Sequence, residues 1–262
     1  MLEDSAPQAM PDTPAYRWRG GRLEPVTDVH DVQLDGLLGI DRQKAALTQN
    51  TRQFVEGRPA NHALLTGARG TGKSSLVKAL LPAFGEQGLR LVAVSPHDLV
   101  ELPDIVTPLR GRPQRFLIYV DDFSVTPGDR ALTALKTALD GGIEAPPDNV
   151  LIVATSNRRH LMPEFQSENA EYHWEDGELH PGETVEEKIS LSERFGLWLS
   201  FPPFDQRRYL ELVGHHLEAL GSAMSADAEA AALRWALQRA SRSGRVAAQF
   251  ARDWVGRQAT AG

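Results

Sequence analysis

The chain has 262 residues, of which 41% are hydrophobic and 24% charged, proportions typical of a globular protein with a substantial core. Its formal net charge of −7 argues against a large positive surface for nucleic acid. The sequence has no cysteine, which excludes disulfides, cysteine-ligated zinc and thiol catalysis. No apolar run approaches the roughly 18 residues of a membrane span, and the acidic start lacks the apolar core of a signal peptide. We therefore expect a cytoplasmic protein.

The N-terminal part predicts an irregular lead followed by a helix. Residues 1–34 begin with a Pro-, Ala- and Asp-rich stretch, and we expect a partly disordered segment with a short extended stretch after Tyr16. From Asp41 to about Glu56 the sequence looks helical, with Asp41 as a candidate N-cap.

Five short apolar runs predict strands of one sheet. They cover residues 61–66, 89–94, 116–120, 150–155 and 196–201. Such nearly continuous apolar runs are typical of strands that are covered on both faces. Helical patterns alternate with them, and Pro82 is expected to end the first of these helices. The alternation favours a parallel α/β sheet.

Two further segments differ in composition from the sheet region. Residues 163–187 are acidic and loop-like, and we interpret them as a solvated surface insertion. After Pro202-Pro203, three helical patterns rich in Ala and Leu predict a small all-α domain over residues 204–262, with the proline pair as the hinge.

One motif in the chain points to specific chemistry. The pattern GxxxxGK[ST] occurs between a predicted strand and a predicted helix, as a phosphate-binding P-loop requires. Its residues are Gly67, Ala68, Arg69, Gly70, Thr71, Gly72, Lys73 and Ser74. Glycines let backbone N–H groups wrap around phosphate oxygens, and the helix N-terminus adds positive potential. Lys73 can reach the terminal phosphates and Ser74 can ligate Mg²⁺. The strand and helix on either side disfavour an ordinary Gly-rich turn.

An acidic pair follows the predicted strand at residues 116–120. Asp121 is a candidate for the Mg²⁺ shell, since the carboxyl end of a parallel strand lies at the ligand-binding edge of a sheet. Asp122 occupies the place of a general base, which must come within about 2.6–3.2 Å of the attacking water. Many ATPases have a Glu there, one methylene longer, so slow hydrolysis is an open alternative. A capping Asp pair is the purely structural interpretation.

With these motifs, the chain resembles AAA+ ATPases and, among them, the bacterial DUF815 group of predicted ATPases. The resemblance extends from about residue 16 to the C-terminus and is carried by residues 37–43, 67–75, 119–124, 154–161 and 192–196. It implies a P-loop NTPase fold: a three-layer αβα domain with a parallel five-stranded sheet over residues 35–203, followed by a helical lid. It also implies ATP and Mg²⁺ as cofactors and a homo-oligomer, either a ring or a helical assembly.

The resemblance assigns roles to further residues. Asn157 looks like sensor 1, which orients the attacking water, although an Asn after a strand can also be a turn residue. Arg194 looks like an arginine finger that serves a neighbouring subunit. The alternative is a surface Arg paired with the acidic insertion. Gly39 and Ile40 resemble the segment that packs against adenine.

Two positions beside these motifs complete the expected nucleotide site. Ser75 extends the P-loop match. Arg245 resembles sensor 2, a lid residue that contacts the nucleotide, on a helix that Ser243 would cap. Arg242 is a competing candidate, and Arg245 could also be an exposed helix residue.

Three functions remain open at this point. The first is an ATPase that switches or remodels an unidentified protein partner. Residues 96–103 lack the aromatic–apolar–Gly pore loop of threading unfoldases, which weakens that version. The second is a loader-like ATPase associated with DNA, against which the net charge of −7 counts. The third is an ATP sensor without turnover. The basic residues 158–160 favour a structural or intersubunit contact over nucleic acid.

Overall fold

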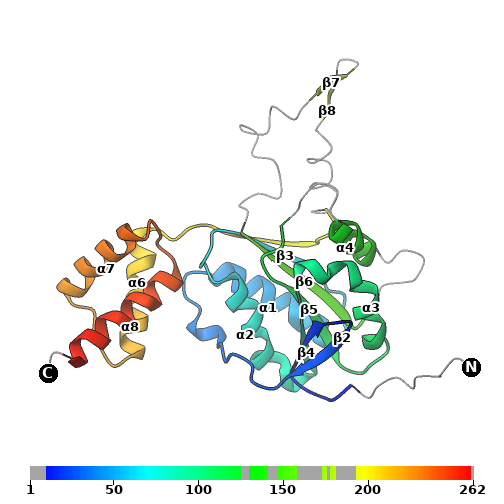
Figure 1. The fold of residues 1–262 in the computed structure, drawn as a ribbon, viewed down its shortest axis with the longest axis horizontal. Coiled ribbons are helices and arrows are strands. Elements are labelled where there is room, and N and C mark those ends of the chain that lie inside the picture. Colours follow the sequence, from blue (N-terminus) through cyan, green and yellow to red (C-terminus); the bar gives the residue numbers. More distant parts are fainter. Residues whose placement is uncertain are drawn as a thin grey trace, which may run out of the picture.

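A computed structural model describes residues 10–124, 130–140, 147–157, 173–175, 178–180 and 193–260. These residues form an α/β body and a helical unit at one end of the molecule (Figure 1). Within the described ranges, no helix is both long enough and apolar enough to cross a membrane.

The body is built on one seven-stranded sheet with the order β2-β1-β4-β5-β6-β3-β9. The five predicted strands are all present and pair in parallel. They are β3 (Ala63–Gly67), β4 (Leu89–Val94), β5 (Arg115–Val120), β6 (Val150–Ser156) and β9 (Leu197–Phe201). The parallel α/β architecture is therefore confirmed, while the predicted count of five strands is corrected to seven.

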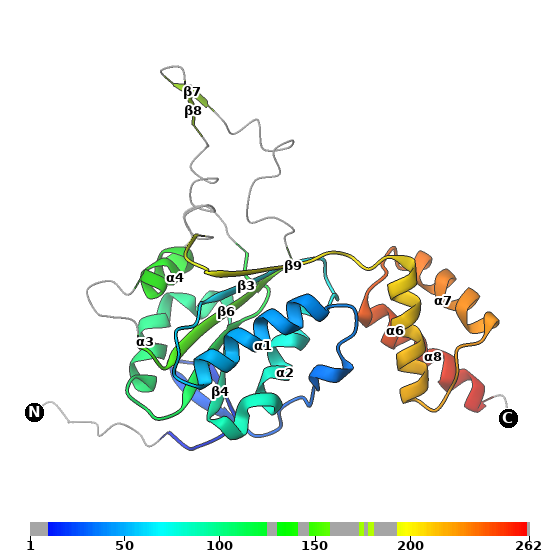
Figure 2. The same cartoon turned by 180° about the vertical axis from the view of Figure 1, so that it is seen from behind.

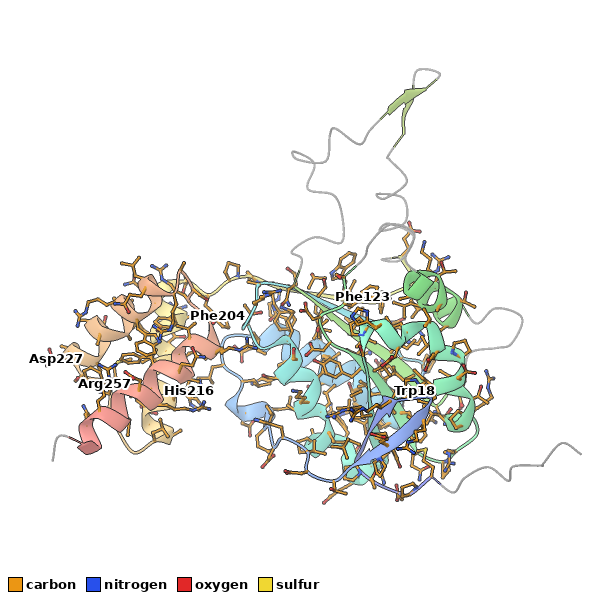
Figure 3. The ribbon with its side chains drawn as sticks, viewed as in Figure 1. Trp18, Phe123, Phe204, His216, Asp227 and Arg257 are labelled. Carbon is orange, nitrogen blue, oxygen red and sulfur yellow. The ribbon has the colours of Figure 1, made fainter. Side chains whose placement is uncertain are left out.

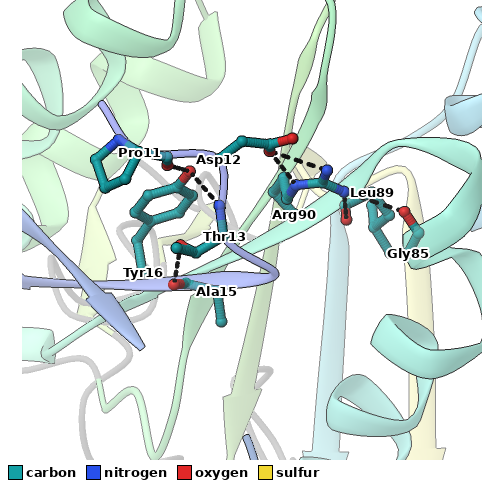
Figure 4. A network of polar contacts seen from close by, with 8 residues as sticks. All are labelled: Pro11, Asp12, Thr13, Ala15, Tyr16, Gly85, Leu89 and Arg90. Carbon is teal, nitrogen blue, oxygen red and sulfur yellow. Dashed lines mark hydrogen bonds and ion pairs between the residues drawn. The ribbon is translucent and has the colours of Figure 1, made fainter. Parts of the chain in front are cut away.

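The two additional strands lie in the N-terminal segment, where the extended stretch expected after Tyr16 is confirmed but its pairing with the sheet was not foreseen. Strands β1 (Ala15–Arg19) and β2 (Arg22–Val26) form an antiparallel hairpin, and β1 pairs in parallel with β4. Tyr16 and Trp18 on β1 are 1% and 6% exposed. Just before β1, Asp12 forms an ion pair at 2.9 Å with Arg90 of β4 (Figure 4). Residues 15–19 and 22–26 of this segment thus belong to the sheet, and residues 1–9 lie outside the described residues.

Helices cover both faces of the sheet. α1 (Asp41–Val55) and α2 (Lys73–Phe84) lie on one face, and α3 (Leu102–Val106) and α4 (Arg130–Asp140) on the other (Figures 1 and 2). Strand β5 illustrates why: alternate side chains join the core under α3 and α4 or the core under α1 and α2. Burial on both faces explains the nearly continuous apolar runs. Because β3, β5 and β6 pair in parallel, their carboxyl ends lie at one edge of the sheet.

Two local expectations about these helices were wrong. Asp41 is the first residue of α1 rather than its N-cap, which is Ile40 without a side-chain cap. α2 continues through Pro82 to Phe84. Because Pro82 lies in the last turn, its missing N–H removes only one terminal hydrogen bond, and the burial of Phe84 keeps that turn in place.

The C-terminal unit contains α6 (Gln206–Ala219), α7 (Ala226–Gln238) and α8 (Gly244–Thr260). They pack around their own core, in which the hydroxyl of Tyr209 donates a 3.1 Å hydrogen bond to the carbonyl of Ala232. Ser243 caps α8 as predicted, since its Oγ accepts from the N–H of Val246 at 3.3 Å. In the predicted acidic insertion, only β7 (His173–Glu175) and β8 (Glu178–His180) are described, and they form an antiparallel pair.

Candidate functional site

A cleft of about 860 Å³ lies between the α/β body and the C-terminal helices. Its walls are the segment before α1, the P-loop, the ends of β5 and β6, and one side of α6 and α8. The predicted site residues that line it are Ile40, Arg69, Gly70, Thr71, Gly72, Lys73, Ser74, Ser75, Asp121, Asp122, Asn157 and Arg245. Figure 3 shows His216, another lining residue, on the side of α6 that faces the body.

The P-loop has the tight backbone that its glycines predict. Gly67, Gly70 and Gly72 all have positive φ, at +134°, +72° and +100°. A Cβ on Gly67 would lie 2.1 Å from the carbonyl oxygen of Phe201 on β9, so only glycine fits there. Thr71 closes the loop by donating from Oγ1 to the carbonyl of Ala68 at 2.8 Å. Such a loop ahead of a helix N-terminus can bind an anion.

Lys73, the first residue of α2, is 5% exposed. Its Nζ donates to the carbonyls of Gly67 at 2.9 Å and Ala68 at 2.8 Å, and to Oδ1 of Asn157 at 3.1 Å. Burial lowers the pKa of Lys73, and the carboxylates of Asp121 and Asp122 oppose this shift. The P-loop therefore holds an ammonium group whose partners are mostly neutral carbonyls, which a phosphate can replace.

Asp121 lies directly beside the P-loop serine. Its Oδ1 accepts hydrogen bonds from Ser74 Oγ at 2.8 Å and from Thr155 Oγ1 at 2.6 Å. Burial alone would raise the pKa of Asp121, but these hydrogen bonds and the charge of Lys78 leave its pKa below the usual value. An ionised carboxylate next to a hydroxyl oxygen is the hard oxygen set that Mg²⁺ prefers, so these residues fit that ion.

Asp122 has a left-handed backbone, with φ at +55°. This conformation is uncommon for a residue other than glycine, although Asp tolerates it better than most. The backbone N–H of Asp122 donates to Thr155 Oγ1 at 3.1 Å, and its Oδ1 accepts from the amide nitrogen of Asn157. The base candidate and the sensor 1 candidate are thus in direct contact.

Arg194 lies at the other end of the sheet. It precedes β9, whose first residue, Leu197, pairs with Ala63 at the amino end of β3, whereas the P-loop follows the carboxyl end of β3. Arg194 is therefore not among the residues that line the cleft of its own chain. Gly39 is also outside the cleft: it packs against Phe204 with φ at +76°. Residues 158–160 lie outside the described residues.

Several residues of the cleft were not foreseen from the sequence. They include His216 and Arg252 of the C-terminal helices. Thr155, a buried residue that bridges the two acids, was not foreseen either. Burial, together with the nearby charges of His215 and Arg252, lowers the pKa of His216. The place of Thr155 in the sequence, two positions before Asn157, could have indicated that its hydroxyl lies near the site. No local pattern indicates which faces of α6 and α8 turn toward the body.

Comparison with known proteins agrees with this geometry. Residues 11–258 match the model of a family described as "Protein of unknown function (DUF815)". The chain belongs to this family. No curated protein matches the DUF815 chain in sequence.

Among solved structures, the DUF815 chain is similar to Thermotoga maritima RuvB, a Holliday junction branch migration motor, at 15% identity with a TM-score of 0.55. The match covers 86% of this chain and 64% of RuvB. Two structures of single-site RuvB mutants each give 16% identity and a TM-score of 0.56, covering 86% and 85% of this chain. The DUF815 chain thus has the AAA+ fold and spans 64% of the length of these RuvB chains.

Proposed function

We propose that this protein binds ATP with Mg²⁺ in the cleft and hydrolyses it. The observation that supports this best is the pair of connections at the P-loop: Ser74 to Asp121, and Lys73 through Asn157 to Asp122. They join a phosphate-binding cation, a metal-binding carboxylate and a base candidate within one wall of the cleft. A structural turn would not need these three groups linked through Ser74 and Asn157.

In this proposal each residue has a limited task. The N–H groups of residues 69–75 and the ammonium of Lys73 bind the phosphates. Ser74 and Asp121 hold Mg²⁺, which neutralises phosphate charge when it is bound. Asp122 accepts the proton of the attacking water, and Asn157 orients that water.

In this proposal, residues 35–203 form the nucleotide-binding domain, and the C-terminal helices (residues 204–262) act as its lid. Gly244 at the start of α8 donates its N–H to the carbonyl of Gly70 at 2.9 Å, which ties the lid to the P-loop. Arg245 follows it and lines the cleft, so we assign it the nucleotide contact. Ile40, which is 3% exposed, supplies an apolar wall against which the adenine ring of ATP packs.

We further propose that the protein works as a homo-oligomer that switches or remodels a protein partner. The position of Arg194, at the sheet end opposite its own P-loop, suits an arginine that completes the site of a neighbouring subunit. A DNA-associated function is the second candidate, because RuvB, with the same fold, is a branch migration motor. Salt-sensitive binding of duplex or junction DNA would favour it.

The nucleotide assignment can be tested with two variants and a control. Lys73→Ala should abolish ATP binding in calorimetry, while Lys136→Ala, on α4 across the sheet, should leave it unchanged. Asp122→Asn should bind ATP but lose turnover, and a pull-down with this ATP-trapped form would report oligomer and partner together. Unchanged ATP affinity in Lys73→Ala would refute the site. Normal turnover in Asp122→Asn would exclude that residue as the base.

A further inference from the structure

Thr155 lies at the carboxyl end of β6 and is 1% exposed. Its hydroxyl uses both hydrogen-bonding capacities on the acidic pair: it donates to Asp121 Oδ1 at 2.6 Å and accepts from the N–H of Asp122 at 3.1 Å. A buried hydroxyl is costly unless it is bonded, and here both bonds go to site residues.

The backbone of Thr155 adds a third connection. Regular pairing of β5 with β6 ends at Val120 and Ala154. Beyond that pair, the carbonyl of Thr155 accepts from the N–H of Phe123 at 2.7 Å. Residues 121–123 therefore remain hydrogen-bonded to β6 after strand β5 has ended. This attachment includes Asp122, whose left-handed φ of +55° needs support from its surroundings.

We infer that Thr155 is a positioning residue that orients both acids of the site, Asp121 toward the metal ion and Asp122 toward the attacking water. This inference rests on the proposed function. Thr155 acts through the carboxylate of one neighbour and the backbone of the other, rather than through the reacting atoms. Partners of metal ligands typically change metal affinity or activity by about 10- to 100-fold when they are removed.

The test compares Thr155→Val, which keeps the shape but removes the hydroxyl, with Thr155→Ser, which keeps the hydroxyl. Mn²⁺ binding is measured by paramagnetic resonance in the presence of a non-hydrolysable ATP analogue. Binding of a fluorescent ATP analogue in EDTA gives the metal-free nucleotide affinity. We expect Thr155→Val to weaken Mn²⁺ binding about 10- to 100-fold and to change metal-free nucleotide affinity by less than about 3-fold. Thr155→Ser should restore Mn²⁺ binding.

A matched control is available on the neighbouring strand β3. Thr66 is also 1% exposed, but its hydroxyl accepts from the indole N–H of Trp198 at 3.1 Å and touches neither acid. Thr66→Val removes an equally buried hydroxyl, so it should lower thermal stability without changing Mn²⁺ affinity. A positioning role predicts that only the Thr155 variant loses metal binding.

The outcomes separate the possible failures. Wild-type affinity for Mn²⁺ in Thr155→Val, or equal losses in the Thr66 control, would overturn the positioning role. A wild-type protein that binds no nucleotide would refute the proposed function itself, and the role of Thr155 with it. If Thr155→Val does not fold, Thr155→Ser is compared with Thr155→Ala. Weaker Mn²⁺ binding in the Ala form alone supports the role, and equal binding in both overturns it.

Discussion

The contact between the P-loop and the lid leads to a quantitative prediction for Gly70→Ala. Gly70 has φ at +72°, and a Cβ added there would lie 2.8 Å from both Cβ and Oγ of Ser243, below the distance that real Cβ atoms tolerate. On the same side, the carbonyl of Gly70 accepts the N–H of Gly244. The methyl group would therefore push the start of α8 away from the P-loop.

Two costs contribute to the expected loss. A left-handed backbone costs a residue with a Cβ about 1–2 kcal/mol. The overlap with Ser243 adds about 1–3 kcal/mol, typical of overpacking. Gly111→Ala isolates the first cost, because Gly111 has φ at +73° with no heavy atom within 4 Å of an added Cβ. Since about 1.4 kcal/mol is a factor of ten, Gly70→Ala should weaken ATP binding about 5- to 150-fold relative to Gly111→Ala.

The assay is titration calorimetry with ATP, combined with thermal unfolding of each variant. Adding Ser243→Gly to Gly70→Ala removes the group that the methyl meets, while glycine at an N-cap costs only a few tenths of a kcal/mol. The double variant should recover part of the lost affinity. If Gly70→Ala binds ATP as tightly as Gly111→Ala, or if Ser243→Gly recovers nothing, the contact between lid and P-loop does not control binding.

Two further predictions concern the proposed intersubunit role of Arg194 and the response of the protein to acid. Mixing Arg194→Ala with Lys73→Ala subunits should restore part of the ATPase activity, because each can supply what the other lacks; no restoration in a confirmed oligomer argues against action in trans. Burial lowers the pKa of His62 to about 4, and its Nδ1 accepts the N–H of Ile152 at 3.0 Å. In the unfolded chain His62 has a pKa of about 6.5, so as the pH falls the unfolded state binds a proton before the folded state does. The free energy of unfolding should therefore fall by up to about 3 kcal/mol between pH 6.5 and 4. Urea unfolding should show this loss in wild type and a flatter profile in His62→Gln.

Most of the parallel sheet could be predicted because its signals are local. A run such as residues 150–154 is apolar without interruption, which is typical of a strand covered on both faces. The extended stretch after Tyr16 was predicted, but its hairpin with β2 and its pairing with β4 were not, although residues 16–19 alternate between apolar and charged. That period of two is a strand signal, but four residues are too few to distinguish a strand from an irregular segment.

The site divides in the same way. The P-loop is contiguous, so its glycines, Lys73 and Ser74 could be assigned from spacing alone. The position of Thr155 between the acids depends on the register in which β5 pairs with β6, which places Val120 opposite Ala154. The contact of Gly244 with Gly70 depends on how the lid packs against the body. Neither is encoded in a local pattern.

The structure also bears on whether a shorter acid can serve as the base. The backbone of Asp122 offsets part of the shorter reach of its side chain, because the left-handed turn and the hydrogen bond to Thr155 set the direction of that side chain. Its carboxylate is held by the amide nitrogen of Asn157, whose oxygen accepts from Lys73. In the proposed site, a phosphate that displaces Asn157 from Lys73 would free the Asn157 amide to reorient together with Asp122. If Asp122 is the base, as proposed, its reach would then depend on phosphate binding as well as on the length of its side chain.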